Sequence, residues 1–164
     1  MTYFVHIESP VGELLLTGDR QILQGLYFNA YRHKPCIDPA WAEDSSPFAA
    51  VRHQLDEYFA GKRQEFNMAL THRGTPFQEQ VWAALQSIPY GQHLTYQEIA
   101  NLIGHPSAPR AVGNAVGSNP LAIIIPCHRV LTTAGKISGF GGSVPAKRHL
   151  LKLEQNLGSQ GGPM

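Results

Sequence analysis

The chain has 164 residues, of which 43% are hydrophobic and 15% are charged, and its formal net charge is +1. Such a composition predicts a globular protein of one or two small domains and excludes a largely disordered chain. No stretch approaches the roughly 18 apolar residues of a membrane span, and the first residues do not resemble a secretory signal. Because Cys36 and Cys127 are the only cysteines, we expect a cytoplasmic protein in a reducing environment.

The charges are unevenly distributed along the chain. Residues 1–75 carry seven Lys or Arg and nine Asp or Glu, whereas residues 76–164 carry six and three. The positive surplus in the second part is small, and an ordinary solvated surface explains it as well as nucleic-acid binding does. It nevertheless places any contact with a polyanion in the C-terminal half.

Alternating apolar and polar residues at the start of the chain predict an antiparallel meander of three strands. The predicted strands are separated by turns and cover residues 2–8, 13–17 and 22–28. A loop is expected at 29–45, followed by a helix from Ser46 to about Ala60 that ends at Gly61. We interpret residues 1–74 as an N-terminal α/β domain without a catalytic cluster, in which residues 65–70 are a candidate for a further strand.

Two capping boxes organise the second part of the chain. Thr75-Pro76-Phe77-Gln78 predicts a helix over about 76–87, and Thr95-Tyr96-Gln97-Glu98 predicts one over about 96–103. After a short turn, a third helix is expected over about 108–118. Two short helices joined by a tight, glycine-containing turn are typical of a helix-turn-helix.

The end of the chain contains one more amphipathic segment. Residues 145–156 predict a last helix with Leu150, Leu151 and Leu153 on its apolar side. We therefore expect a mostly helical C-terminal domain over 75–157. The Gly- and Ser-rich residues 158–164 are expected to form a flexible tail.

The third predicted helix has two different faces. Its apolar residues follow helical spacing and predict a buried stripe of Ala108, Ala111, Val112, Ala115 and Val116. The opposite face carries Pro109, Arg110, Gly113, Asn114 and Gly117. Each glycine lowers helix stability by about 1 kcal/mol relative to alanine, which is useful if another backbone approaches closely. That backbone belongs either to DNA or to a tightly packed neighbouring helix. One arginine among small residues suits a narrow minor groove and predicts little base specificity.

An apolar run over residues 121–125 stops abruptly at charged residues. The β-branched residues 123–125 predict a buried strand, and Pro126 prevents this strand from continuing. Cys127 is therefore expected at the floor of a pocket. A buried thiol is more often structural than reactive. His128 and Arg129 directly after it favour a reactive cysteine, because a packed core has no use for two charges there.

The pentapeptide Pro126-Cys127-His128-Arg129-Val130, downstream of a helix-turn-helix, resembles the O6-alkylguanine-DNA alkyltransferases, also called methylated-DNA–protein-cysteine methyltransferases. Further motifs of that family occur in the expected order: Ile88-Pro89-Tyr90-Gly91, Tyr96, Arg110-Ala111-Val112-Gly113, Ser118-Asn119-Pro120 and Gly139-Phe140-Gly141-Gly142. The resemblance covers about residues 3–155. It implies an RNase H-like N-terminal α/β domain with an antiparallel sheet and a mostly helical C-terminal domain.

The resemblance also implies a function. An alkyl group passes irreversibly from guanine O6 in double-stranded DNA, and also from O4-alkylthymine, to the protein's own Cys127 in a single turnover. No cofactor takes part, and we expect a monomer that can bind DNA cooperatively. His33 and Cys36 alone are a poor tetrahedral set, so no metal is expected.

The chemistry requires a thiolate, and a free thiol titrates near about 8.5. His128 can accept the thiol proton directly or through a water, and by the resemblance Glu154 holds His128. From its residue type alone, Glu154 would instead be a solvated charge. Arg129 belongs to the motif but is expected to be structural.

The target base has to leave the duplex before a buried thiol can reach it. By the resemblance, Arg110 fills the vacated space, and Tyr96 rotates the phosphate and donates a hydrogen bond to the extruded guanine. Asn119 would join the recognition helix to the active-site segment. Without the resemblance, Tyr96 could equally be a core residue and Asn119 a turn former.

The substrate pocket is assigned by the same resemblance. The backbone carbonyls of Cys127 and Val130 would accept from the guanine amine, and Lys147 would line the pocket. Phe140 would form the wall of a loop that closes over the alkyl group, with the Gly141 amide near O6.

Two other classes of protein remain open. A cysteine hydrolase could use Cys127, His128 and Glu154 as a triad, but it requires turnover and an oxyanion hole. A DNA-binding regulator without chemistry needs base-reading side chains, which the third helix lacks.

Overall fold

The computed structural model describes residues 1–32, 34–137 and 144–161. Its N-terminal part contains a four-stranded sheet in the order β3-β2-β1-β4. The antiparallel meander is confirmed: β1 (Tyr3–Ile7) pairs with β2 (Leu14–Gly18), and β2 pairs with β3 (Leu23–Phe28). The fourth strand, β4 (Ala42–Glu43), pairs in parallel with β1 inside the segment predicted to be a loop. Two residues in a polar segment carry too little pattern to be recognised as a strand.

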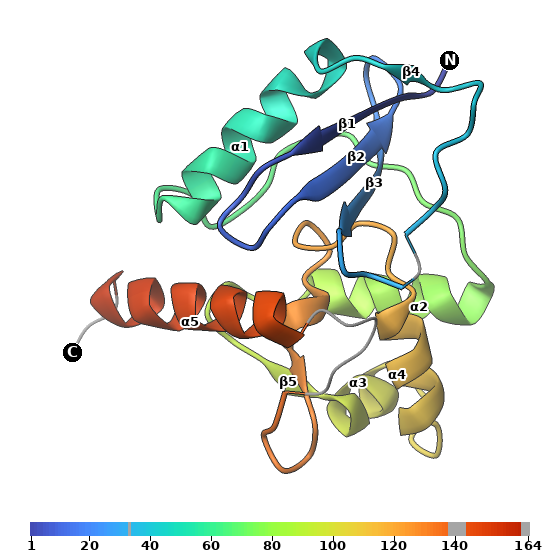
Figure 1. Cartoon of the computed structure of the whole chain (residues 1–164). Coiled ribbons are helices and arrows are strands. Elements are labelled where there is room, and N and C mark those ends of the chain that lie inside the picture. The colour runs from blue at the N-terminus through green and yellow to red at the C-terminus, as the bar shows by residue number, and fades with distance from the viewer. Residues whose placement is uncertain (33, 138–143, 162–164) are drawn as a thin grey trace.

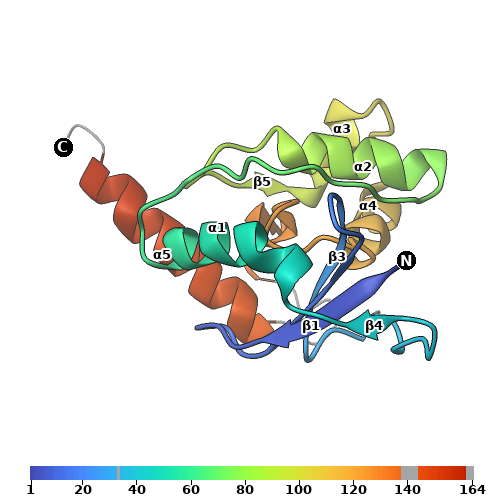
Figure 2. The same cartoon turned by 90° about the horizontal axis from the view of Figure 1, so that it is seen from above.

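The first helix packs beside this sheet (Figures 1 and 2). A short 3-10 turn, η1 (Ser46–Phe48), leads into α1 (Ala49–Phe59), and Gly61 takes a φ of 77° after the helix, as the sequence predicted. The candidate strand at 65–70 reduces to an isolated bridge between Leu70 and Leu23. Helix α1 buries Val51, Leu55 and Tyr58. Of these three side chains, only Tyr58 has a polar group, its hydroxyl.

The C-terminal part is mostly helical, and the two capping boxes are confirmed. Thr75 Oγ1 accepts a hydrogen bond from the Gln78 amide at 3.1 Å, and Thr95 Oγ1 accepts one from the Glu98 amide at 3.0 Å. These caps begin the first two helices of this part. Its elements are α2 (Pro76–Gln86), β5 (Leu94–Thr95), α3 (Tyr96–Leu102), α4 (Pro109–Gly117), η2 (Cys127–Arg129), β6 (Val130–Leu131) and α5 (Val144–Gly161).

The strand predicted at 123–125 is wrong. Residues 122–125 form a tight turn in which Ile123 has a φ of 70°, a conformation that β-branched residues rarely adopt. The Ile125 amide donates to the Leu121 carbonyl at 2.8 Å, which closes this turn. The apolar run is buried as expected. Three hydrophobic residues, however, do not distinguish a strand from a buried turn.

Helix α5 is longer than predicted, since it continues to Gly161. The part of the expected tail at 158–161 is therefore helical. Glycine lowers helix propensity without forbidding the helix, and the first proline after Pro145 is Pro163, so nothing in the intervening sequence forces an earlier end.

The two halves of the chain share one hydrophobic core. A single cluster of buried residues contains Leu16 and Leu26 from the sheet, Leu85 from α2, and Ile123 and Ile125 from the turn. Leu26 also pairs with Leu121 in an isolated bridge, which ties the sheet to the segment before Cys127. In the described ranges, no helix is both long and apolar enough to cross a membrane.

Candidate active site

Cys127 begins the short turn η2, directly after the apolar turn, and its side chain is 2% exposed. The Cys127 amide donates to the Ile125 carbonyl at 2.7 Å, which fixes the backbone at the thiol. Burial raises the pKa of the Cys127 thiol, while the Asn119 side chain and the positive charge of Lys147 oppose this shift. The resting thiol is therefore protonated at neutral pH and needs a base to react.

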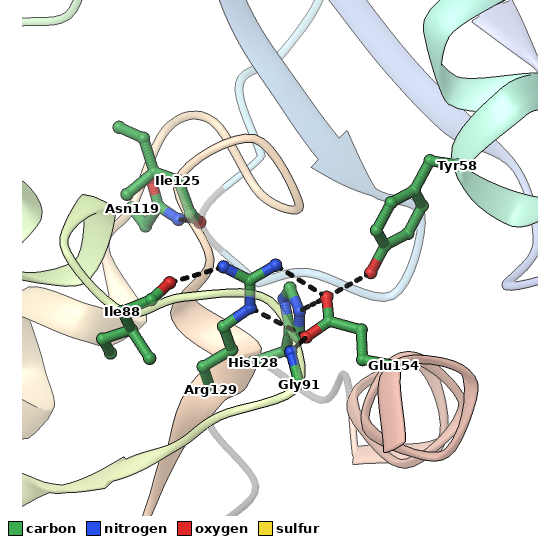
Figure 3. A network of polar contacts seen from close by, with 8 residues as sticks. All are labelled: Tyr58, Ile88, Gly91, Asn119, Ile125, His128, Arg129 and Glu154. Carbon is green, nitrogen blue, oxygen red and sulfur yellow. Dashed lines mark hydrogen bonds and ion pairs between the residues drawn. The ribbon is translucent and has the colours of Figure 1, made fainter. Parts of the chain in front are cut away.

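Glu154 on α5 is the centre of a buried polar network (Figure 3). Its Oε2 accepts from the Tyr58 hydroxyl at 2.5 Å, contacts His128 Nε2 at 2.7 Å and accepts from Arg129 Nη2 at 2.9 Å. Its Oε1 accepts from Arg129 Nε at 2.8 Å and from the Gly91 amide at 3.4 Å. The expectation of a solvated glutamate is thereby excluded, because the side chain is 1% exposed.

These partners decide the charge on Glu154. Burial alone would raise the pKa of this carboxyl group, but the hydrogen bonds and charges of His128 and Arg129 hold it well below its usual value. Glu154 is therefore a carboxylate at neutral pH. An ionised carboxylate only accepts hydrogen bonds, so His128 Nε2 carries the proton that is shared with it.

The other ring nitrogen of His128 is then the acceptor. Burial lowers the pKa of His128, an effect that the Glu154 hydrogen bond and charge partly oppose. The ring is therefore neutral at neutral pH. His128 Nδ1 is buried and has no hydrogen-bond partner within the described residues. A neutral histidine with a fixed tautomer and an available lone pair is suited to accept a proton from a neighbouring group.

Arg129 has a structural position, as the sequence predicted. Its guanidinium group binds Glu154 through two nitrogens, and its third, Nη1, donates to the Ile88 carbonyl at 2.7 Å. The guanidinium carbon lies 5.8 Å from the centroid of the Tyr90 ring. These contacts join Glu154 to the segment that follows α2.

Asn119 lies between α4 and the turn that precedes Cys127, where it is 1% exposed. Its Oδ1 accepts from the Leu121 amide at 3.0 Å, and its Nδ2 donates to the Ile125 carbonyl at 2.8 Å. Asn119 thus cross-links both ends of the turn. These two hydrogen bonds make Asn119 a turn-forming residue and also connect the end of α4 to the segment before Cys127.

Lys147 and Tyr96 lie together near the thiol. Lys147 is 2% exposed, and its Nζ is 5.8 Å from the centroid of the Tyr96 ring. Burial lowers the pKa of Lys147 to about 8, and the neighbouring Cys127 acts in the opposite direction. Val130, the other pocket residue predicted inside the described part, is fully buried at the start of β6.

Two of the predicted pocket residues, Phe140 and Gly141, lie outside the described residues. Cys127 is buried, as expected for a residue at the floor of a pocket. A cavity of about 280 Å³ between the two halves is lined by Pro126 and Arg129 but not by Cys127.

The structure shows how exposed the face of α4 is that was predicted to contact DNA. Arg110 and Asn114 are exposed, and Gly113 is partly exposed. Gly117, however, is buried, and its carbonyl accepts a hydrogen bond from the Tyr31 hydroxyl. Ala111, expected in the buried stripe, is exposed. The buried side of α4 therefore differs from the prediction at both positions, and Gly117 is covered by Tyr31, three residues after β3.

Gly113 distinguishes the two explanations for the small residues of α4. A Cβ atom at this position would meet the Tyr96 ring at 3.8 Å, which is an ordinary van der Waals distance. Close packing within the protein therefore does not require glycine here. The alternative explanation, the approach of an external backbone, remains for Gly113.

The described residues contain no group of three or more His, Cys, Asp or Glu side chains that could hold a metal ion. His33, one of the two residues weighed as metal ligands, lies outside the described ranges. Cys36 is exposed.

A buried thiol, a histidine held by a buried carboxylate, and the two short helices α3 and α4, of which α4 exposes Arg110 and Asn114, define a class of proteins with a candidate nucleophilic cysteine at a candidate nucleic-acid interface. The model of the 6-O-methylguanine DNA methyltransferase DNA binding domain matches residues 76–156, and that of the ribonuclease-like domain of the same proteins matches residues 2–71. The chain belongs to the 6-O-methylguanine DNA methyltransferase family, which confirms the resemblance in the sequence.

Relatives are similar over nearly the whole chain. The chain is 46% identical over 156 residues to the methylated-DNA–protein-cysteine methyltransferase of Mycobacterium tuberculosis, covering 95% of this chain and 94% of the relative. It is 45% identical over 152 residues to that of Methanosarcina acetivorans, covering 93% and 97%. The crystal structure of Mycobacterium tuberculosis OGT in complex with DNA superimposes with a TM-score of 0.88 at 44% identity, covering 94% of each chain.

Sequence reasoning missed one residue of the network. Tyr58 lies in the half of the chain that was expected to contain no catalytic cluster, 96 residues before Glu154. Its position in the apolar pattern of α1 predicts burial, and nothing in the sequence indicates what its hydroxyl meets.

Proposed function

We propose that this protein repairs DNA by moving the alkyl group of O6-alkylguanine in double-stranded DNA to the sulfur of its own Cys127. The observation that carries this proposal is the buried Cys127 beside a neutral His128 that Glu154 holds in one tautomer. It occurs in a chain 46% identical to a methylated-DNA–protein-cysteine methyltransferase.

The reaction is a displacement at the alkyl carbon. The Cys127 sulfur forms a bond to that carbon while the bond between the carbon and guanine O6 breaks. The thiol proton passes to His128 Nδ1, directly or through one water, and is then passed on through water to the departing guanine, which leaves as the neutral base. Glu154 stabilises the imidazolium that forms, without becoming protonated itself.

The product explains why the protein works once. An S-alkylcysteine is a thioether, which is no longer a nucleophilic thiolate and has no hydrolysable bond to the protein. The proposed stoichiometry is therefore one alkyl group per protein molecule.

The substrate base has to be extruded, because Cys127 is 2% exposed and O6 inside a duplex cannot reach it. In the proposed complex, α3 and α4 act as a helix-turn-helix, and α4 enters the minor groove with its small residues. Arg110, exposed on α4, takes the place of the extruded base, while Gly113 and Asn114 approach the backbone. Tyr96 donates to the extruded guanine.

The remaining site residues form the proposed pocket. Asn119 fixes the turn before the thiol, and Lys147 and the carbonyl of Val130 line the base site. O4-alkylthymine presents the same alkoxy carbon beside a ring nitrogen and is proposed as a second substrate. The N-terminal part is proposed to be RNase H-like, and the protein to act as a monomer on the DNA of the cytoplasm.

The test is a titration with excess duplex DNA that contains radiolabelled O6-methylguanine. We expect label to appear on the protein up to one equivalent and then to stop, and no transfer to the Cys127→Ser variant. Continued release of label beyond one equivalent, or turnover of ester substrates, would instead indicate the hydrolase alternative.

A further inference from the structure

Tyr58, from the N-terminal half of the chain, is buried and its hydroxyl donates a hydrogen bond to Glu154, the residue that holds His128. We propose that Tyr58 is a positioning residue for alkyl transfer, whose hydroxyl fixes the Glu154 carboxylate and sets how strongly that carboxylate supports proton uptake by His128. This inference rests on the proposed function, since it assigns a role within the same reaction.

The geometry is direct. The Tyr58 hydroxyl lies 2.5 Å from Glu154 Oε2, the same oxygen that contacts His128 Nε2 at 2.7 Å (Figure 3). Tyr58 is 0% exposed, so no water competes for this bond. Burial, followed by the nearby Glu154 charge, raises the pKa of Tyr58, which therefore remains a hydrogen-bond donor at all working pH values.

The tyrosine ring is held by aromatic neighbours from three segments. Its centroid lies 5.4 Å from that of Phe59 and 6.2 Å from that of Tyr90, both at edge-to-face angles, and 5.3 Å from that of Phe66. Such pairs fix the orientation of a ring in addition to burying it. The hydroxyl is thus preorganised, and Glu154 adapts to it.

The hydroxyl affects the base through the shared oxygen. A donor on Oε2 withdraws charge from the carboxylate and makes it a weaker partner for a positive imidazolium. Without this donor, Oε2 would interact more strongly with His128 and favour the imidazolium. Tyr58 therefore keeps His128 neutral and able to accept the Cys127 proton.

Three charged groups of the described residues act on His128. Glu154 and Lys147 face it from α5, and Arg129 faces it from its own turn, while Cys127 interacts with Lys147. Glu154 in addition faces Tyr58 from α1 and Tyr90 from the turn after α2. Replacing the Tyr58 hydroxyl by hydrogen leaves every formal charge unchanged, so the change isolates the hydrogen bond.

The test uses Tyr58→Phe in the full chain, with free O6-benzylguanine as the probe, so that DNA binding does not contribute. The single-turnover rate is measured between about pH 5.5 and 8.5. We expect the acidic limb to move to higher pH. At pH 6 the variant should react about tenfold more slowly than the wild type, and at pH 8 less than about threefold more slowly, because a base that is already protonated cannot accept the thiol proton.

Two control variants separate this role from a merely structural one. Tyr3→Phe removes a tyrosine hydroxyl on β1, where the ring contacts Arg20 rather than the network. Val51→Ala removes buried packing from α1 and leaves the Tyr58 hydroxyl and its aromatic neighbours in place. We expect Val51→Ala to lower the thermal unfolding temperature, and both controls to keep the pH profile of the wild type.

A second substitution tests the opposite direction and does not depend on the folding of Tyr58→Phe. 3-Fluorotyrosine at position 58 is a stronger hydrogen-bond donor and should move the acidic limb to lower pH. If both changes at position 58 leave the acidic limb of the pH–rate profile at the pH found for the wild type, the inference is overturned. If the wild type acquires no methyl group from duplex DNA containing O6-methylguanine, the proposed function fails instead, and the two failures are thus distinguished.

Discussion

Replacing Arg129 by methionine removes the only cation that binds both oxygens of Glu154 within the described residues. Two hydrogen bonds to the carboxylate are lost, at 2.8 and 2.9 Å, together with the one to the Ile88 carbonyl. Breaking a buried ion pair by removing one partner costs about 3–5 kcal/mol, because the other charge stays buried. We expect Arg129→Met to lower the free energy of unfolding by that amount, against a typical total of about 5–15 kcal/mol.

The assay is urea unfolding at neutral pH, with Arg63→Met as the matched control. Arg63 pairs with Glu57 at 2.9 Å, but both side chains are about 30% exposed. An exposed pair contributes at most about 1 kcal/mol, so this control should unfold almost like the wild type. Equal losses in the two variants would refute the reasoning, since burial would then not determine the contribution of the pair.

The pH dependence gives an independent check of the same pair. The pKa of Glu154 is depressed in the folded protein, so its contribution to stability is present above the unfolded value of about 4.5 and is lost as the pH falls through the folded value. In Arg129→Met the pKa is less depressed. The stability difference between wild type and variant should therefore shrink as the pH falls below about 5. A difference that stays constant down to the acid transition would contradict the assignment.

Three further predictions concern the DNA-facing helix and the base. Arg110→Ala should slow repair in duplex DNA and barely change the reaction with free O6-benzylguanine; equal losses in the two assays would contradict its proposed role. Gly113→Ala should make α4 more stable by up to about 1 kcal/mol in thermal unfolding, because there is room for the Cβ, yet it should weaken binding to duplex DNA in a fluorescence titration. Unchanged affinity would show that no external backbone approaches Gly113. Since burial lowers the pKa of His128, alkylation of Cys127 by O6-benzylguanine should slow only below about pH 6.5, and a midpoint above 7 in the pH–rate profile would exclude a neutral buried base.

Local sequence signals predicted the elements whose causes are local. The boxes at Thr75 and Thr95 begin helices as expected, because each cap satisfies backbone amides only three residues away. The meander follows from alternation within each strand. The motif at Cys127 likewise identified the thiol, its histidine and, through the resemblance, Glu154.

Features that depend on distant contacts were not predictable in the same way. Ile123 takes a left-handed conformation because Asn119 and the core fix both ends of its turn, and hydrophobicity alone contains no sign of this. Gly117 was placed on the wrong face because the contact of its carbonyl with Tyr31 comes from 86 residues away. The contact between Tyr58 and Glu154 was likewise not predictable, because the two residues are 96 positions apart and lie in different halves of the chain.

The central claim is that one particular sulfur keeps the alkyl group. Incubation with duplex DNA containing O6-methylguanine, followed by mass analysis of the digested protein, tests this directly. We predict the added mass of one methyl group on the peptide that contains Cys127 and none on the peptide that contains Cys36, which is exposed and lies outside the His128–Glu154 network. A methyl group on Cys36, or repaired DNA with both cysteine peptides unmodified, would contradict the account.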